Sequence, residues 1–147
     1  MSLDRRPPAL HSFAYAALRV MSGLVVAQHG FQKLFGWLAN PGRPAPPAEM
    51  FSLMWFVGIL EIVGGFSVAA GFFTRPLAFL LSGEMAVAYF WKHAPNSFFP
   101  VVNRGEPAVM LCFAFFLFAM AGAGRWSVDG MLGRGRTLRQ ESVPDNL

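Results

Sequence analysis

The sequence contains a single cysteine, Cys112, and few charged residues, and each scarcity excludes a class of function. One thiol cannot form an internal disulfide, so a dithiol mechanism within this chain is excluded. Only 14% of the 147 residues are charged, whereas 54% are hydrophobic. A soluble domain of this length needs more polar residues to cover its core. We therefore predict an integral membrane protein in contact with the lipid bilayer.

Motifs for metal binding, nucleotide binding and hydrolysis are also missing. The sequence has no CxxCH motif, no Cys/His cluster, no glycine-rich phosphate loop and no Ser/His/Asp arrangement. We predict no metal site, and the missing motifs argue against a stand-alone hydrolase or kinase. The net charge of +4 comes with no basic stripe interleaved with aromatic residues, so we also predict no binding of nucleic acid.

Four apolar stretches organise the chain. They cover residues 12–35, 51–73, 77–91 and 107–123. About 20 helical residues cross the roughly 30 Å hydrocarbon core of a bilayer. The sequence therefore predicts an all-α fold, a four-helix transmembrane bundle within residues 12–130. The irregular segment 94–106 is expected either to lie on the bilayer or to fold over the bundle.

Basic residues predict the orientation of the bundle. Seven flank one side and four flank the other: Arg5, Arg6, Arg75, Arg125, Arg134, Arg136 and Arg139 against Lys33, Arg43, Lys92 and Arg104. Because positive charge is enriched on the cytoplasmic side, we predict a multi-pass protein of a bacterial inner membrane with both termini in the cytoplasm. Residues 1–11 and 131–147 would then be cytoplasmic tails.

Three charged residues, Arg19, Glu61 and Glu84, lie well inside the predicted spans. A charge there is costly, so each should face the bundle interior and find a partner. Arg19 and Glu84 each lie roughly 10 Å from the cytoplasmic ends of their helices, which predicts that they pair. Glu61 would then lack a basic partner and hold a proton, which makes it the predicted proton carrier. The alternatives are that these residues only support helix packing, or that Glu61 is the ionised partner of Arg19.

Titratable residues also gather near the predicted outer surface. His29 and Lys33 end the first stretch and Glu106 begins the fourth, at a level where a quinone head group could bind. We predict these three as ligand-binding residues. Lys92 and His93 are better explained as interfacial side chains that reach towards water. A haem held by His29 and His93 is not favoured, because two histidines alone are a weak signal.

Several short motifs occur in an order that resembles the DoxX family. They are Arg19, His29-Gly30-Phe31-Gln32-Lys33-Leu34, Glu61-Ile62-Val63-Gly64-Gly65, Gly71-Phe72-Phe73-Thr74-Arg75, Glu106, and Gly122-Ala123-Gly124-Arg125-Trp126-Ser127-Val128-Asp129. The resemblance covers roughly residues 18–130 and is specific in combination. It implies a small bacterial inner-membrane protein of four helices, related to subunits of a thiosulfate:quinone oxidoreductase and to membrane partners of thiol and oxidative-stress enzymes.

These observations lead to one main functional hypothesis and two alternatives. The main hypothesis is a membrane subunit or anchor of a quinone-linked redox complex, non-catalytic by itself, with a protein partner. The first alternative is a membrane protein or transporter that binds a small molecule or lipid without redox activity, and a transporter would require a homo-oligomer. The second alternative is a pure membrane scaffold.

Overall fold

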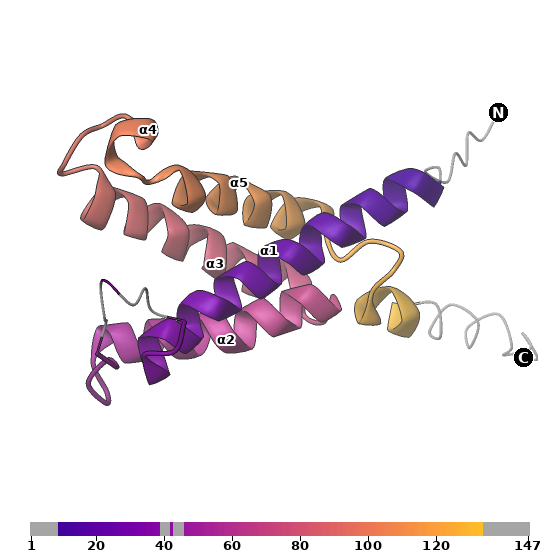
Figure 1. The fold of residues 1–147 in the computed structure, drawn as a ribbon. Coiled ribbons are helices and arrows are strands. Elements are labelled where there is room, and N and C mark those ends of the chain that lie inside the picture. The colour runs from indigo at the N-terminus through magenta and orange to yellow at the C-terminus, as the bar shows by residue number, and fades with distance from the viewer. Residues whose placement is uncertain (1–8, 39–41, 43–45, 134–147) are drawn as a thin grey trace, which may run out of the picture.

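The computed structural model describes residues 9–38, 42 and 46–133, and every regular element within them is helical (Figure 1). The elements are α1 (Ala9–Phe35), α2 (Leu53–Ala70), α3 (Thr74–Ala88), the π-helix η1 (Tyr89–His93), α4 (Pro100–Asn103) and α5 (Glu106–Ala121). A further short helical segment covers residues 128–133. The predicted all-α class is confirmed, while most of both predicted tails and Arg43 lie outside the described residues.

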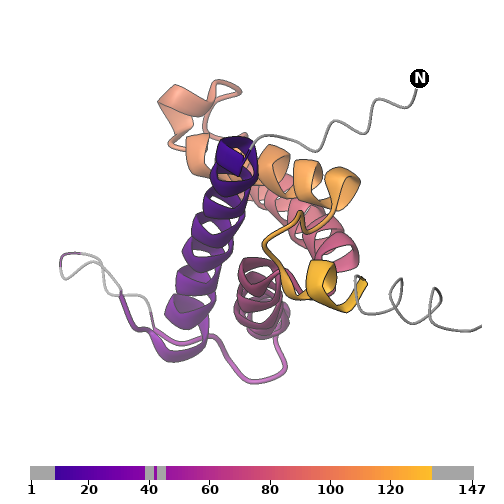
Figure 2. The same ribbon diagram turned by 90° about the vertical axis from the view of Figure 1, so that its right-hand side faces the viewer.

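The longer helices pack as two antiparallel pairs, α1 with α2 and α3 with α5. Contacts of α2 with α3 and of α1 with α5 join the pairs, and Figure 2 shows the molecule turned so that the right-hand side of Figure 1 faces the viewer. We call the end that holds the α2–α3 turn the turn end. The opposite end, which holds the α1–α2 and α3–α5 connections, is the loop end. In Figure 1 the pairs lie close at the turn end and separate towards the loop end.

Glycines allow α1 and α2 to touch along their backbones. A Cβ atom added to Gly65 would lie 2.6 Å from the carbonyl oxygen of Gly23, and one added to Gly30 would lie 2.7 Å from that of Gly58. Such contacts admit no side chain at these positions. Small residues at interfaces are the usual means by which helices approach closely in membranes. The two crossing points fix the register of α1 against α2.

The turn between α2 and α3 lies three residues earlier in the chain than the sequence suggested. Helix α2 ends at Ala70 and is capped by Gly71, which adopts a left-handed conformation with φ of 74°. Helix α3 begins at Thr74, three residues before the predicted start, so Thr74-Arg75-Pro76 is the first turn of the helix and not a separate loop. Pro76 is tolerated there because the backbone N–H groups of a first turn have no acceptor within the helix.

Large apolar side chains cover the flanks of the molecule as well as its core. Val26, Val68, Leu81, Phe115 and Phe118 are fully buried. Many others point outward, among them Phe13, Val63, Phe79, Leu80, Phe113 and Phe116. Helices α1 and α2 are each long and apolar enough to cross a membrane, and α5 is an apolar helix of 16 residues. An apolar surface of this extent requires a covering other than water.

Candidate functional site

The centre of the candidate site is an ion pair between Lys33 of α1 and Glu61 of α2. The Lys33 Nζ atom lies 2.6 Å from both Oε1 and Oε2 of Glu61. Glu61 is 0% exposed, whereas the Lys33 side chain is 28% exposed. The two residues come together because Gly30 and Gly58, one turn away, bring the helix backbones into contact.

This ion pair corrects the prediction that Glu61 has no basic partner. That prediction compared the depths of the two backbone positions, and it placed Lys33 at the outer end of its helix. A lysine ammonium is carried on a flexible four-carbon stem and can lie far from its own backbone. In the structure Lys33 packs against Gly58, one turn before Glu61 on α2, so its ammonium reaches the Glu61 carboxylate.

Glu84 of α3 supplies a second carboxyl group to the same place. Leu81 of α3 packs against Gly64 of the antiparallel helix α2. Glu84, one turn after Leu81, therefore lies at the level of Glu61, one turn before Gly64. We call Lys33, Glu61 and Glu84 the acid–base cluster. The Glu84 Oε2 atom is buried, and within the described residues it has no hydrogen-bond partner. The cluster therefore contains two carboxyl groups, one ammonium group and one buried carboxyl oxygen without a partner among the described residues.

Arg19 belongs to a different part of the molecule, and its predicted pair with Glu84 is wrong. The guanidinium donates to the carbonyl oxygens of Ala123, of Trp126 at 2.7 Å and of Ala69 at 3.3 Å. In the described part of the chain no hydrogen bond or ion pair joins Arg19 to Glu84. The carbonyls at the C-terminal end of a helix have no partner within the helix and carry partial negative charge, so they bind a cation as a carboxylate would.

The segment after α5 closes the turn end, and sequence reasoning missed two of its residues. Asp129 accepts hydrogen bonds from the backbone N–H groups of Phe73 and Thr74, both at 3.1 Å, and so caps α3. Ser127 packs against Gly71 and donates to the Gly124 carbonyl at 2.6 Å. We call residues 122–129 the closing segment. The motif Gly122–Asp129 is the available sequence signal, but its contacts depend on the tertiary path of the chain.

The other predicted binding residues are only partly brought together. His29 is exposed on α1, one turn before Lys33, and no described hydrogen bond or ion pair connects it to the acid–base cluster. His93 instead contacts the Asn103 carbonyl oxygen through Nδ1 at 3.1 Å. Glu106 is exposed at the start of α5, and no described polar contact connects it to the cluster. The described residues contain no group of three or more His, Cys, Asp or Glu side chains placed to hold a metal ion.

Comparison with known proteins places this chain in a family. The DoxX family model matches residues 14–94, which include Arg19 and the whole acid–base cluster. An uncharacterized protein of Haemophilus influenzae is 36% identical over 118 residues, covering 78% of this chain and 87% of that protein. The inner membrane protein YphA of Escherichia coli K12 is 28% identical over 122 residues, covering 76% of this chain and 84% of YphA. No solved structure matches. The chain therefore belongs to the DoxX family of membrane proteins.

Proposed function

We propose that this protein is the membrane subunit of a redox complex and binds a quinone head group at the acid–base cluster, with which it exchanges a proton. The observation that carries the proposal is the buried, unpartnered Oε2 atom of Glu84 beside the Lys33–Glu61 ion pair. A buried polar atom without a partner is costly, and a ligand that bonds to it removes that cost.

The charge balance of the cluster indicates which carboxyl group holds the proton. Lys33 neutralises Glu61, and no second cation is in contact with Glu84 among the described residues. A second carboxylate would leave a net negative charge in an apolar interior, so the neutral acid is the favoured form of Glu84. This moves the proposed proton-carrying role from Glu61 to Glu84. Glu61 then holds the Lys33 ammonium in position.

A quinone is the ligand class that fits these donors. Its carbonyl oxygens accept hydrogen bonds, which a protonated Glu84 and the Lys33 ammonium are able to donate. Reduction of a quinone to a quinol consumes two electrons and two protons. The cluster exchanges protons, while the electrons must come from a redox-active partner protein, because a single cysteine supplies no dithiol pair. His29 and Lys33 keep their predicted binding role in this proposal, and Glu106 does not.

We expect binding of ubiquinone-1 to depend on Glu84 and not on Glu106. In purified protein, quenching of tryptophan fluorescence by ubiquinone-1 should show a dissociation constant that rises about tenfold or more in Glu84→Leu, because the leucine lacks the donor. Glu84→Gln should retain most of the affinity, since its amide also donates a hydrogen bond. Glu106→Gln is the matched control and should bind like the unchanged protein.

Infrared spectroscopy tests the proton separately from the ligand. At neutral pH the unchanged protein should show a protonated carboxyl band that disappears in Glu84→Gln and persists in Glu106→Gln. Equal ubiquinone-1 affinity in Glu84→Leu and the unchanged protein would rule out binding at this cluster. Absence of the band would rule out the proton-carrying role even if the quinone binds.

We also propose that the molecule crosses a bacterial inner membrane four times, as a four-helix bundle with the turn end in the cytoplasm. Helix α3 and η1 are continuous and have 15 and 5 residues, which together provide the 20 residues of a full span. Arg75 and Arg125 lie at the turn end, and in the sequence the arginines at positions 5, 6, 134, 136 and 139 precede α1 or follow residue 133. This distribution supports a cytoplasmic turn end by the bias of positive charge.

Cysteine labelling tests this orientation. In a Cys112→Ser background, cysteines at Glu49 and Asn96, both exposed at the loop end, should react with a membrane-impermeant maleimide in intact spheroplasts. A cysteine at Ser142 in the C-terminal tail should react only after the membrane is permeabilised. The reverse pattern would invert the proposed orientation, and labelling of only one of the two loops would contradict four crossings.

A further inference from the structure

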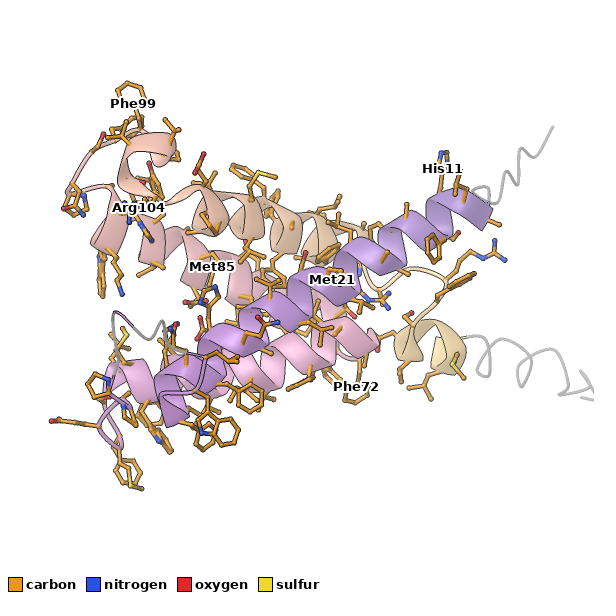
Figure 3. The ribbon with its side chains drawn as sticks, in the orientation of Figure 1. His11, Met21, Phe72, Met85, Phe99 and Arg104 are labelled. Carbon is orange, nitrogen blue, oxygen red and sulfur yellow. The ribbon has the colours of Figure 1, made fainter. Side chains whose placement is uncertain are left out.

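The connection between η1 and α5, residues 94–105, presents apolar side chains outward. Phe98, Phe99, Val101 and Val102 are between 65% and 72% exposed, so they do not pack against the helices of their own chain. Figure 3 shows Phe99 pointing away from the helices at the tip of this connection. We call these four side chains the loop face.

Side chains of the protein form hydrogen bonds with backbone groups of the same connection. Asn103 donates to the Ser97 carbonyl oxygen at 2.6 Å and accepts from the Gly105 N–H at 2.7 Å. Tyr89, which is buried, donates its hydroxyl to the Phe98 carbonyl oxygen. Irregular backbone is tolerated at membrane depth only where its polar groups find partners in the protein. These internal hydrogen bonds give several backbone groups of the connection a partner within the protein.

The length of α5 gives an independent reason to place the loop face in the bilayer. At 1.5 Å per residue, the 16 residues of α5 measure about 24 Å, which is roughly 6 Å less than the hydrocarbon core. The partner helix α3 continues through η1 and has no such deficit. Figure 1 shows α4 beyond the first residue of α5 and beside the end of the α3–η1 helix. The connection thus occupies the depth that α5 leaves unfilled.

We infer that the loop face is a lipid-binding surface that lies among the acyl chains of the leaflet at the loop end. On either side of this connection in the sequence, Trp91 of η1 and Met110 of α5 are also exposed apolar side chains, each 71% exposed. Lys92, next to Trp91, is exposed and supplies a cation at the level of the lipid phosphates. A bilayer covers all of these side chains together, whereas a soluble partner on the loop face would leave the flanks uncovered.

Site-directed spin labelling tests this placement. With Cys112 replaced by serine, a nitroxide is attached to a cysteine at Val101 or at Val102, and the protein is reconstituted in vesicles of phosphatidylethanolamine and phosphatidylglycerol. Both labels should collide more with oxygen, which dissolves in lipid, than with the water-soluble nickel complex NiEDDA. A label at Asn96, an exposed polar residue of the same connection, is the matched control and should show the reverse preference.

Two results would overturn the inference. Labels at Val101 and Val102 that favour NiEDDA as strongly as the Asn96 label would place the loop face in water. Labels that are shielded from both reagents would show that protein covers it, whether a second copy or another chain. Two label sites keep the test valid if one variant fails to fold, and the Cys112→Ser background preserves the described hydrogen bond at that position, because Ser82 donates to the backbone carbonyl of Cys112.

Discussion

Replacing Arg19 with alanine is expected to lower the free energy of unfolding by about 3–5 kcal/mol, one of the two largest single effects we expect in this protein. The side chain is 2% exposed and donates to three backbone carbonyls. Alanine would leave these acceptors buried without a donor, and each such loss costs about 1–3 kcal/mol. A drop of this size should prevent much of the protein from surviving extraction in detergent.

The effect is large because Arg19 joins three parts of the chain. Ala69 belongs to the last turn of α2, while Ala123 and Trp126 belong to the closing segment, and Arg19 itself is in the middle of α1. The charge also lies at the negative ends of α2 and α5, where a cation is stabilised by the helix dipoles. Losing the guanidinium therefore weakens α1, α2 and the closing segment at once.

Thermal melts in detergent, with two comparisons, separate this role from a general effect of charge. Arg75→Ala removes an exposed arginine from the same end and should change the midpoint little. Arg19→Lys keeps the charge but replaces a planar fork with one nitrogen, so it should recover only part of the loss. If Arg19→Ala melts with the same midpoint as Arg75→Ala, the carbonyl contacts do not stabilise the protein as described.

Features that depend on residue spacing were predictable from the sequence. Gly23 and Gly30 share one face of α1 by helical spacing, as Gly58 and Gly65 share one face of α2, and the structure places Gly23 against Gly65 and Gly30 against Gly58. This works because helical periodicity fixes which residues share a face before any tertiary contact is known. The apolar runs likewise predicted where the four longer helices lie, although the ends shifted by a few residues.

Features that depend on the tertiary path were not predictable. Helix α3 starts at Thr74 because Asp129, 55 residues away along the chain, caps its N-terminus. The partners of Arg19 are backbone carbonyls, which every residue carries and no sequence pattern marks. The irregular segment 94–106 contains α4, and the helix before it continues as the π-helix η1, two details that local propensity did not indicate.

The other large effect is expected from Lys33→Met, which removes the partner of a fully buried carboxylate. Glu61 is 0% exposed and has the Lys33 ammonium 2.6 Å from both of its oxygens. Breaking a buried ion pair by removing one partner typically costs about 3–5 kcal/mol, because the remaining charge is left without compensation. Methionine has a similar length and keeps the packing of the lysine stem, so the loss can be assigned to the charge.

Removing the Glu61 carboxylate should cost less stability than removing the Lys33 ammonium. This difference would identify a buried charge without a partner as the cause of the loss in Lys33→Met. In Glu61→Gln the stranded group is Lys33, whose side chain is 28% exposed and close to the end of α1, so the ammonium can turn towards water. The double variant, Lys33→Met with Glu61→Gln, removes both charges and should be more stable than Lys33→Met alone. Lys92→Met, which removes an exposed lysine at the same end, is the control for a general effect of charge.

Thermal midpoints of these four variants in one detergent would decide the issue. We expect Lys33→Met to have the lowest midpoint, Glu61→Gln and the double variant to lie above it, and Lys92→Met to match the unchanged protein. If the losses in Lys33→Met and Glu61→Gln simply add in the double variant, the two side chains do not interact and the ion pair at the centre of the acid–base cluster is absent. In that case Lys33 would not neutralise Glu61. The argument that Glu84 is the protonated carboxyl group of the cluster would then no longer hold.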